Sequence, residues 1–322
     1  MDSDKGIPPK KTFIADDNDP TYRDLEEKKE LDLNSPNYPE NLLNSFLGYN
    51  IEYAFPVQGT EADIYRIKKN NTEYVLKLYR YGIFPKLLQK VAEICQSVPD
   101  HVVQIFEYGY DEDKKRYYEI QEFARGGSLK DLIDSRKFQI KLLKTFINEI
   151  SQAIHALHKH NIIYADLKPG NILIRDLSTF DLILNDFGIA YNIDPDIPIQ
   201  FSTPKGTLSY LAPELISGFI GNQIDYWALG IIVLEIIMGE HPFAGMDRQI
   251  IIQILTTQNI EIPKNIPTEY LSLLKGLLTR DPKKRWGNKE VSSWLSGKEE
   301  LPIYYDTIES SAKPPFLPQS VE

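Results

Sequence analysis

The segment YADLKPGNILI, residues Tyr164 to Ile174, places three polar side chains at a spacing that could do chemistry. Asp166, Lys168 and Asn171 stand at offsets zero, two and five, and the residues around them are apolar or turn-forming. A carboxylate there could orient an attacking hydroxyl, an ammonium could neutralise charge on a transferred group, and an amide oxygen could bind Mg²⁺. Together these side chains are typical of phosphoryl transfer from ATP.

Two residues elsewhere in the chain would complete this chemistry. Lys77, in YVLKLYR, falls on an expected strand whose rigid backbone could hold an ammonium against the α- and β-phosphates. Asp186, in LNDFG, follows a short apolar strand and precedes Gly188, so the chain can bend there and present a carboxylate to the metal. Either residue alone is a weak signal, because lysines and aspartates are common on protein surfaces.

The elements that must position these residues change in type along the chain. Residues 51–122 contain runs that alternate between apolar and polar side chains, such as DIYRIKK, TEYVLKLYR and RYYEIQEF, and these predict strands. After residue 127 the apolar period changes to three and four residues, which predicts a long amphipathic helix that ends near His160. The apolar run from Trp227 to Met238 is too short to span a bilayer and predicts a buried helix.

We therefore predict an α+β fold over residues 49–297, in which a small β-rich lobe, about 49–122, precedes a larger and mainly helical lobe, about 128–297. Residues 1–48 are rich in charged side chains, Asn and Pro, and they predict a flexible acidic extension. Residues 298–322 contain several prolines and predict an extended tail. A solvated leader and a tail that packs on the large lobe or stays mobile are the simpler expectations, although either end could bind a docking partner.

Composition and charge limit the kinds of protein this can be. The chain has 322 residues, 42% of them hydrophobic, which is enough for packed cores. Its formal net charge of −10 argues against a protein that grips nucleic acid or an anionic membrane by bulk electrostatics. The single cysteine, Cys95, cannot form an internal disulfide and the N-terminus has no apolar signal sequence, so we expect a cytoplasmic protein.

Six segments that follow one another along the chain carry a family resemblance. They are ADLKPGN (165–171), DFG (186–188), GTLSYLAPE (206–214), DYWALG (225–230), GEHPF (239–243) and RDPKKRW (280–286). In this order they resemble the eukaryotic-type Ser/Thr protein kinase family, over about residues 51–295. The resemblance implies a two-lobed protein kinase fold and the ATP- and Mg²⁺-dependent transfer of a γ-phosphate to Ser or Thr hydroxyls of a protein substrate.

The resemblance also implies a role for each polar residue. Asp166 would orient the substrate hydroxyl, while Lys168 would neutralise charge, and the hydroxyl of Thr207 would bridge the two. Asn171 and Asp186 would hold Mg²⁺. The expected nucleotide-binding residues are Val57, Gly59, Ile64, Val75, Lys77, Glu93, Glu122 and Ala124.

Three supporting contacts follow from the same resemblance. Glu214 would pair with Arg285 inside the large lobe. Asp225 would hold the backbone of the catalytic loop from beneath, and Tyr164 would pack under Phe187. These contacts would fix the loops that carry the polar residues.

Three features depart from the family pattern. The glycine-rich loop is reduced to VQGTEADI, which keeps only Gly59, so we expect weakened nucleotide affinity or a loop that does not close on ATP. The acidic partner of Lys77 is less clear, because Glu93 is the only glutamate in the helix LLQKVAEICQS and Gln89 is the other option. Ala165 stands where the family has an arginine that binds a phosphate on the activation segment.

Because alanine cannot bind an anion, we expect an enzyme that is not gated by phosphorylation of that segment, in which Ser202, Thr203 and Ser209 are candidate phosphorylation sites. A catalytically weak or inactive pseudokinase that acts as a nucleotide-binding scaffold is the alternative interpretation, since fold does not prove activity. A phosphotransferase for small molecules is a third. The strand lysine and both aspartates are present, which favours the active protein kinase.

Overall fold

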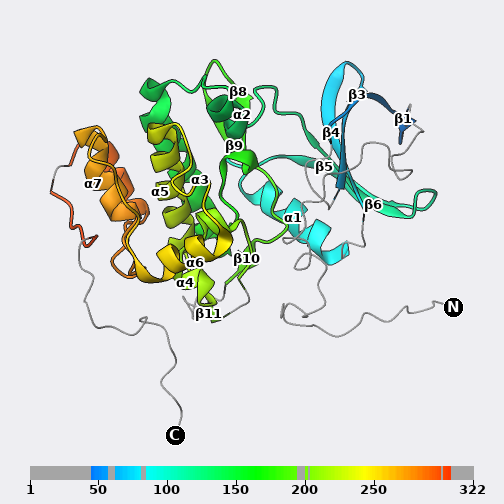
Figure 1. Ribbon diagram of the computed structural model, residues 1–322. Helices are drawn as coiled ribbons and strands as arrows, with labels where there is room; N and C mark the ends of the chain where they lie inside the picture. The colour runs from blue at the N-terminus through cyan, green and yellow to red at the C-terminus, as the bar shows by residue number, and fades with distance from the viewer. Residues whose placement is uncertain are drawn as a thin grey trace, which may run out of the picture.

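The computed structural model shows two lobes (Figure 1), and the chain passes from one to the other between residues 122 and 129. The expected α+β fold, with a β-rich first lobe and a helical second lobe, is confirmed. The structure describes residues 45–56, 62–80, 85–193, 200–201, 204–298 and 300–305.

An antiparallel sheet of six strands forms the small lobe. Its strands are β1 (Ser45–Phe46), β2 (Tyr49–Ala54), β3 (Ala62–Lys69), β4 (Thr72–Tyr79), β5 (Ile105–Asp111) and β6 (Arg116–Glu122). They lie in the order β1-β2-β3-β4-β6-β5, so β6 is inserted between β4 and β5. Asn70 and Asn71 have φ values of 50° and 64° and form the turn between β3 and β4. The sheet begins before the expected start of the domain at residue 49, and Phe46 lies in its core with 3% of its surface exposed.

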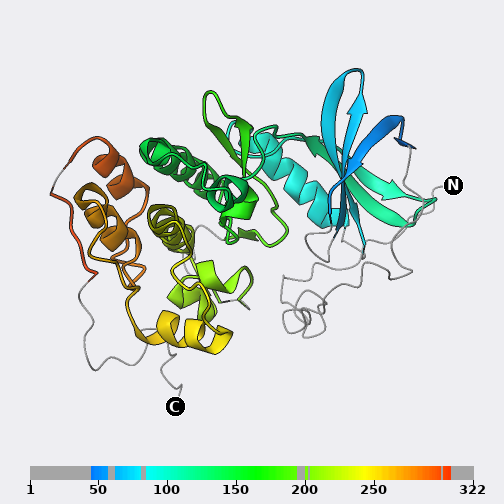
Figure 2. The same cartoon turned by 45° about the horizontal axis from the view of Figure 1, so that its top comes forward.

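The two faces of the sheet bury different kinds of side chain. On one face, an apolar cluster includes Leu76, Leu78 and Ile120, each 1% exposed or less. On the opposite face, neighbouring positions of β4 and β6 carry Lys77 and Glu119, which are also buried. The helix α1 (Pro85–Ser97) contacts β5 and lies on the side of the sheet nearer the large lobe (Figure 2).

Helices make up most of the large lobe. They are α2 (Leu129–Asp134), α3 (Leu143–Lys159), α4 (Pro213–Ile216), α5 (Gln223–Met238), α6 (Arg248–Thr257), α7 (Thr268–Leu277) and α8 (Asn288–Leu295), with short 3-10 helices η2 (Ile140–Leu142), η3 (Pro169–Asn171) and η4 (Leu208–Tyr210). Three pairs of short strands join them: β7 (Ile162–Ile163) with β10 (Tyr191–Asn192), β8 (Ile172–Asp176) with β9 (Asp181–Leu184), and β11 (Gln200–Phe201) with β12 (Phe219–Ile220). The loops on either side of the β8–β9 pair carry the polar residues singled out in the sequence.

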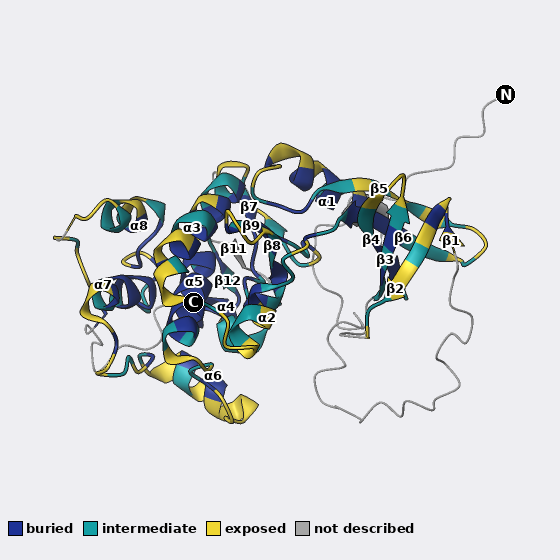
Figure 3. Cartoon of the chain, turned by 90° about the horizontal axis from the view of Figure 1, so that it is seen from above, coloured by how far each residue is buried: buried dark blue, intermediate teal, exposed yellow. Residues whose placement is uncertain are grey.

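Helix α5 is buried along nearly its whole length, as its apolar sequence predicts (Figure 3). It contacts α3, which is amphipathic as predicted, and α7. Gly230 permits the close approach of α7, because a Cβ at this position would lie 2.9 Å from the Cβ of Leu277. The helix ends at Gly239, whose φ of 77° is a left-handed value that glycine adopts without strain. No helix within the described ranges has both the length and the apolar character that a membrane span needs.

The first residues of the expected tail pack on the large lobe. Trp286 donates its Nε1–H to the carbonyl of Pro302 at 2.7 Å, and Asn259 donates its side-chain amide to the carbonyl of Tyr305 at 2.7 Å. Tyr305 is 8% exposed. The rest of the tail and residues 1–44 lie outside the described residues.

Gly276 of α7 provides a test of this packing. A Cβ there would lie 2.1 Å from Cδ2 of Trp286, whose side chain is 1% exposed. We expect Gly276→Ala to lower the free energy of unfolding by about 2 kcal/mol, since overpacking of about 3 kcal/mol exceeds the roughly 1 kcal/mol that alanine gains over glycine in a helix. Urea denaturation of both proteins measures this difference.

The matched control is Gly170→Ala in η3. A Cβ at this position would have Cδ of Lys130, 4.0 Å away, as its nearest neighbour, so we expect a change of about 0.5 kcal/mol or less. A Gly276→Ala protein as stable as the unmutated one would show that the ring of Trp286 moves aside.

Candidate active site

The loop after β7 is held from beneath by helix α5. Asp225, in the first turn of α5, accepts hydrogen bonds from the backbone N–H groups of Tyr164 at 3.0 Å and Ala165 at 2.8 Å. Its carboxylate also lies 2.8 Å from Nε2 of His158 on α3. Asp225 is 1% exposed, so these partners replace the water that a buried carboxylate would otherwise lack. The predicted contact between Asp225 and this loop is confirmed.

The segment before α4 packs closely against this loop. Ala165 has a φ of 65°, a left-handed value that residues with a Cβ rarely adopt. Its carbonyl oxygen approaches Gly206 so closely that a Cβ on that glycine would lie 2.9 Å from it. Gly206 itself has a φ of 110°. Glycine at this point therefore lets the next residue, Thr207, reach the side chain of Asp166.

The carboxylate of Asp166 accepts four hydrogen bonds from three residues, one of them from a backbone N–H. Its Oδ2 accepts hydrogen bonds from Nζ of Lys168 at 2.7 Å and from Nδ2 of Asn171 at 2.8 Å. Its Oδ1 accepts from the backbone N–H of Thr207 at 3.3 Å and from the hydroxyl of Thr207 at 3.2 Å. Lys168 also donates to that hydroxyl at 2.9 Å, so the predicted bridge by Thr207 is present. Burial raises the pKa of Asp166, and Lys168 offsets only part of that effect.

Asp186 stands at a bend just after β9. Its φ of 65° is left-handed, and its Oδ1 lies 3.4 Å from the backbone N–H of Gly188. Between them, Phe187 is buried and packs edge-on against Tyr164, with ring centroids 5.1 Å apart, as predicted. The hydroxyl of Tyr164 donates to the backbone carbonyl of Asn185. The ring of Tyr164 thus supports the bend, and the carboxylate of Asp186 lies close enough to Lys77 of the small lobe to raise the pKa of that lysine.

Lys77 reaches across from the small lobe to this bend. Its Nζ lies 3.2 Å from Oε1 of Glu119 and 3.5 Å from Oδ1 of Asn185, the residue before Asp186. Burial alone would lower the pKa of Lys77, but the carboxylates of Glu119 and Asp186 outweigh it and raise the pKa. The ammonium of Lys77 in the small lobe and the carboxylate of Asp186 in the large lobe therefore interact electrostatically.

Glu93 is not the partner of Lys77 in this structure, which corrects the expectation from the sequence. The side chain of Glu93 is exposed on α1 and accepts a hydrogen bond from Gln89 at 2.8 Å. The ion pair is made instead by Glu119, which lies directly opposite Lys77 on the adjacent antiparallel strand. Glu119 belongs to none of the motifs identified in the sequence. Its position beside Lys77 depends on which strands pair.

The other expected nucleotide-binding residues, apart from Glu122, divide into three groups. Ile64 lies directly across from Lys77 on β3, and Val75 lies two residues before it on β4, so all three side chains project from one face of the sheet. Ala124 is buried just after β6. Val57 and Gly59, in the reduced glycine loop, lie outside the described residues.

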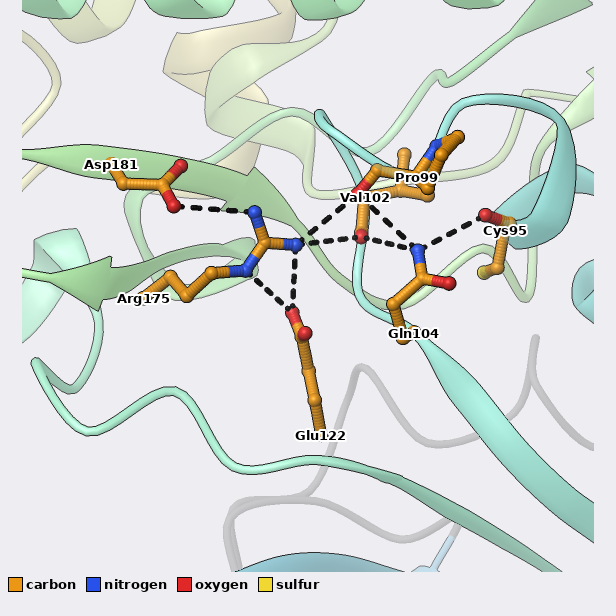
Figure 4. Close-up of polar contacts among 7 residues, drawn as sticks. All are labelled: Cys95, Pro99, Val102, Gln104, Glu122, Arg175 and Asp181. Carbon is orange, nitrogen blue, oxygen red and sulfur yellow. Dashed lines mark hydrogen bonds and ion pairs between the residues drawn. The ribbon is translucent and has the colours of Figure 1, made fainter.

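Glu122 directs its side chain toward Arg175, in a polar cluster that also includes Asp181 and Gln104 (Figure 4). Its carboxylate pairs with Arg175 of β8 at 3.1 Å, and its backbone N–H donates to the carbonyl of Gln104 at 2.9 Å. Arg175 also pairs with Asp181 at 3.2 Å and donates to the carbonyl of Pro99 at 3.2 Å. Burial raises the pKa of Glu122 more than Arg175 lowers it. Arg175 thus connects strands of the large lobe to the hinge. The sequence signals this contact only by an arginine within an apolar strand.

Glu214 and Arg285 form a buried pair with two parallel hydrogen bonds, of 2.5 and 2.8 Å. The predicted pairing is confirmed. Arg285 uses its remaining N–H groups on the backbone carbonyls of Thr279, Gln223 and Arg280. The pair therefore fastens α4, at the end of the segment that carries Thr207, to the core of the large lobe.

The donor set at the bend fits a hard divalent cation. The amide nitrogen of Asn171 donates to Asp166, so the atom with which Asn171 can bind a metal is its oxygen. With the carboxylate of Asp186 this gives oxygen donors of the type that Mg²⁺ prefers. Among the described residues no group of three or more His, Cys, Asp or Glu side chains could hold a metal by itself. Mg²⁺ in phosphate sites needs only one or two protein ligands beside the phosphates.

Comparison with known proteins finds similarity over the part of the chain that contains these residues. A family model described as protein kinase domain matches residues 58–294. The chain is 31% identical over 256 residues to serine/threonine-protein kinase AtPK2/AtPK19 of Arabidopsis thaliana, which covers 76% of this chain and 51% of that protein. It is 31% identical over 241 residues to serine/threonine-protein kinase ULK3 of Homo sapiens, with coverage of 70% and 50%. With Aurora kinase of Saccharomyces cerevisiae it shares 30% identity over 250 residues, with coverage of 74% and 66%. The chain spans about half the length of several curated relatives that it matches.

Replacing Arg285 tests how much the buried pair stabilises the large lobe. We expect Arg285→Met to lower the free energy of unfolding by about 3–5 kcal/mol, because it leaves the carboxylate of Glu214 buried without a countercharge. Urea denaturation measures this loss. Lys284→Met is the matched control, since Lys284 is exposed and lies 3.9 Å from Asp281, and we expect a change of about 0.5 kcal/mol or less. Equal, small effects of both changes would contradict the role assigned to the pair.

Proposed function

Because the chain belongs to the protein kinase domain family, we propose that it is an ATP- and Mg²⁺-dependent kinase that transfers the γ-phosphate of ATP to serine or threonine hydroxyls of proteins. The observation that carries this proposal is the convergence on one carboxylate, Asp166, of Lys168, Asn171 and Thr207. The bond between Lys168 and Thr207 supports serine or threonine as the acceptor, as do the relatives described as serine/threonine-protein kinases.

Each residue of the site would have a separate role in the transfer. Asp166 would accept a hydrogen bond from the substrate hydroxyl and take its proton, and its raised pKa makes it a better base than an exposed aspartate. As the hydroxyl oxygen bonds to the γ-phosphorus, the bond from that phosphorus to ADP breaks. Lys168 would neutralise charge on the transferred group, and Lys77 would hold the α- and β-phosphates.

The metal and the adenine would bind on either side of these groups. Asn171 and Asp186 would hold Mg²⁺, which when bound supplies positive charge to the phosphate oxygens. Ile64 and Val75 would line the apolar side of the nucleotide, together with Val57 and Gly59 of the reduced glycine loop. Glu122 and Ala124 would contribute backbone groups, and because the N–H of Glu122 is engaged by Gln104, its carbonyl is the group that would meet the adenine.

We further propose that phosphorylation of the activation segment does not gate this kinase. Ala165 offers a methyl group where a phosphate-binding arginine would be needed. Two contacts support this proposal: Asp225 holds the loop from beneath, and Thr207 connects the segment to Asp166 without a phosphate.

Asp186→Asn tests the proposed activity. Asparagine keeps the size of the side chain and tolerates the left-handed backbone, but removes the negative charge that would hold the metal. We expect incorporation of labelled phosphate into casein to fall by about 10²–10³-fold, with an unchanged melting temperature. Asp113→Asn, in the exposed turn between β5 and β6, makes the same chemical change and should leave incorporation unaltered.

The outcome for the unmutated protein separates the alternatives. If it shows neither phosphate transfer nor a thermal shift with Mg·ATP, the proposed function is wrong. If it binds Mg·ATP and transfers no phosphate to casein or to itself, it is a nucleotide-binding scaffold.

Changing Ser202 and Thr203 together to alanine tests the proposed lack of gating. These two residues lie outside the described ranges, in the segment before Thr207. We expect kcat and the KM for ATP to stay within a few fold of the unmutated enzyme, because Ala165 cannot respond to a phosphate there. Activity that is lost with alanine and regained with glutamate at both positions would mean that another cation binds the phosphate.

A further inference from the structure

The ion pair between Lys77 and Glu119 is built entirely within the sheet of the small lobe. The two residues lie directly opposite each other in the antiparallel pairing of β4 with β6, and their side chains project from the same face. Nζ of Lys77 is 3.2 Å from Oε1 of Glu119, and the side chains are 10% and 3% exposed. The backbone hydrogen bonds of two neighbouring strands therefore fix the separation of the two charged groups.

Helix α1 places a thiol, and not a carboxylate, near this pair. Cys95 is 1% exposed, and burial together with the nearby charge of Glu119 raises the pKa of its thiol to about 12. Residues Val91, Ile94 and Val98 of the same segment are buried and apolar. Glu93, the only glutamate of α1, is exposed and engaged by Gln89. Cys95 is therefore the α1 side chain whose charge state acts on Lys77, and the carboxylate of Glu93 is engaged elsewhere.

The pair is poorly suited to a purely structural role. Oε2 of Glu119 is buried and has no hydrogen-bond partner within the described residues. A buried ion pair with an unsatisfied oxygen adds little to stability compared with apolar residues of the same size. Lys77 also reaches Asn185, beside the proposed metal ligand Asp186, so its ammonium is held where nucleotide phosphates would bind. Both features are those of a pair that positions a cation for a ligand.

We propose that Glu119 is the residue that positions Lys77 on the nucleotide, and that it does so in place of a carboxylate on α1. In protein kinases the strand lysine is held by a glutamate from the neighbouring helix, so the pair forms only when that helix is correctly placed. Here both partners belong to neighbouring strands of one sheet, so the pair needs no group from α1. The inference rests on the proposed function, because it assumes that Lys77 binds nucleotide phosphates.

Calorimetric titration with Mg·AMP-PNP tests the proposal on the full chain. Glu119→Gln keeps the shape of the side chain and removes its charge, and we expect the Kd to rise about tenfold. In steady-state assays the same variant should raise the KM for ATP and lower kcat, while the KM for a peptide substrate is unchanged. The matched control, Glu112→Gln, makes the same change in the exposed turn of the β5–β6 hairpin and should leave the Kd unaltered.

A double-mutant cycle separates positioning of Lys77 from a general effect on folding. If Glu119 acts through Lys77, then Glu119→Gln should raise the Kd in the presence of Lys77 but add nothing in a Lys77→Met background. The double variant buries no unpaired charge, so it remains measurable if Glu119→Gln alone unfolds. An effect of equal size in both backgrounds overturns the proposal.

Two further outcomes keep this inference distinct from the proposed function. If the unmutated protein binds Mg·AMP-PNP and phosphorylates protein, but Glu119→Gln matches it in Kd and kcat, Glu119 does not position Lys77 and the kinase activity stands. A loss of affinity with Glu93→Gln and none with Glu119→Gln would return the role to α1. Failure of the unmutated protein to bind Mg·AMP-PNP would remove the proposed function and this inference together.

Discussion

The buried carboxylate of Asp225 fixes where the catalytic loop lies relative to the rest of the large lobe. It accepts two backbone N–H groups of the loop and sits beside His158, so an anion inside the protein is satisfied by groups that would otherwise be unpaired themselves. Helix α5, which carries it, is buried on nearly all sides and cannot shift without disturbing the core. The position of Asp166, and through it those of Lys168, Asn171 and Thr207, follows from this anchor.

Both apolar packing and specific polar contacts connect the facing parts of the two lobes. The cluster of the sheet, around Leu76 and Ile120, is separate from that of the large lobe, but several buried side chains of α1 belong to the large-lobe cluster. In addition, Lys77 contacts Asn185 on the nucleotide side, and Arg175 contacts Glu122 behind the hinge. Polar contacts of this kind depend strongly on distance and direction, and they can be exchanged for contacts with water or with a ligand. A site that admits and releases a charged nucleotide between two lobes benefits from both properties.

On the proposed roles, the site depends on rigid elements where related enzymes use movable ones. The ammonium of Lys77 is held by a residue of the neighbouring strand. The loop before β8 has Ala165 at the position where an arginine would respond to a phosphate. The pairing of β4 with β6 fixes the position of Lys77, and the buried helix α5 fixes the position of the loop.

The sequence alone determined the α+β architecture, the buried helix α5 and most of the residues around Asp166, because those signals are local: period, length, and residue types at short spacing. It also led to Glu214, Arg285 and Asp225 through motifs that the family keeps in fixed order. The tertiary structure decided what depends on pairing between distant segments. Glu119 faces Lys77 because β6 inserts between β4 and β5, and Arg175 reaches Glu122 because β8 ends behind the hinge. Helical period shows that α1 has an apolar face but not which turn meets Lys77, so Glu93 could be placed only once the packing of α1 against the sheet was known.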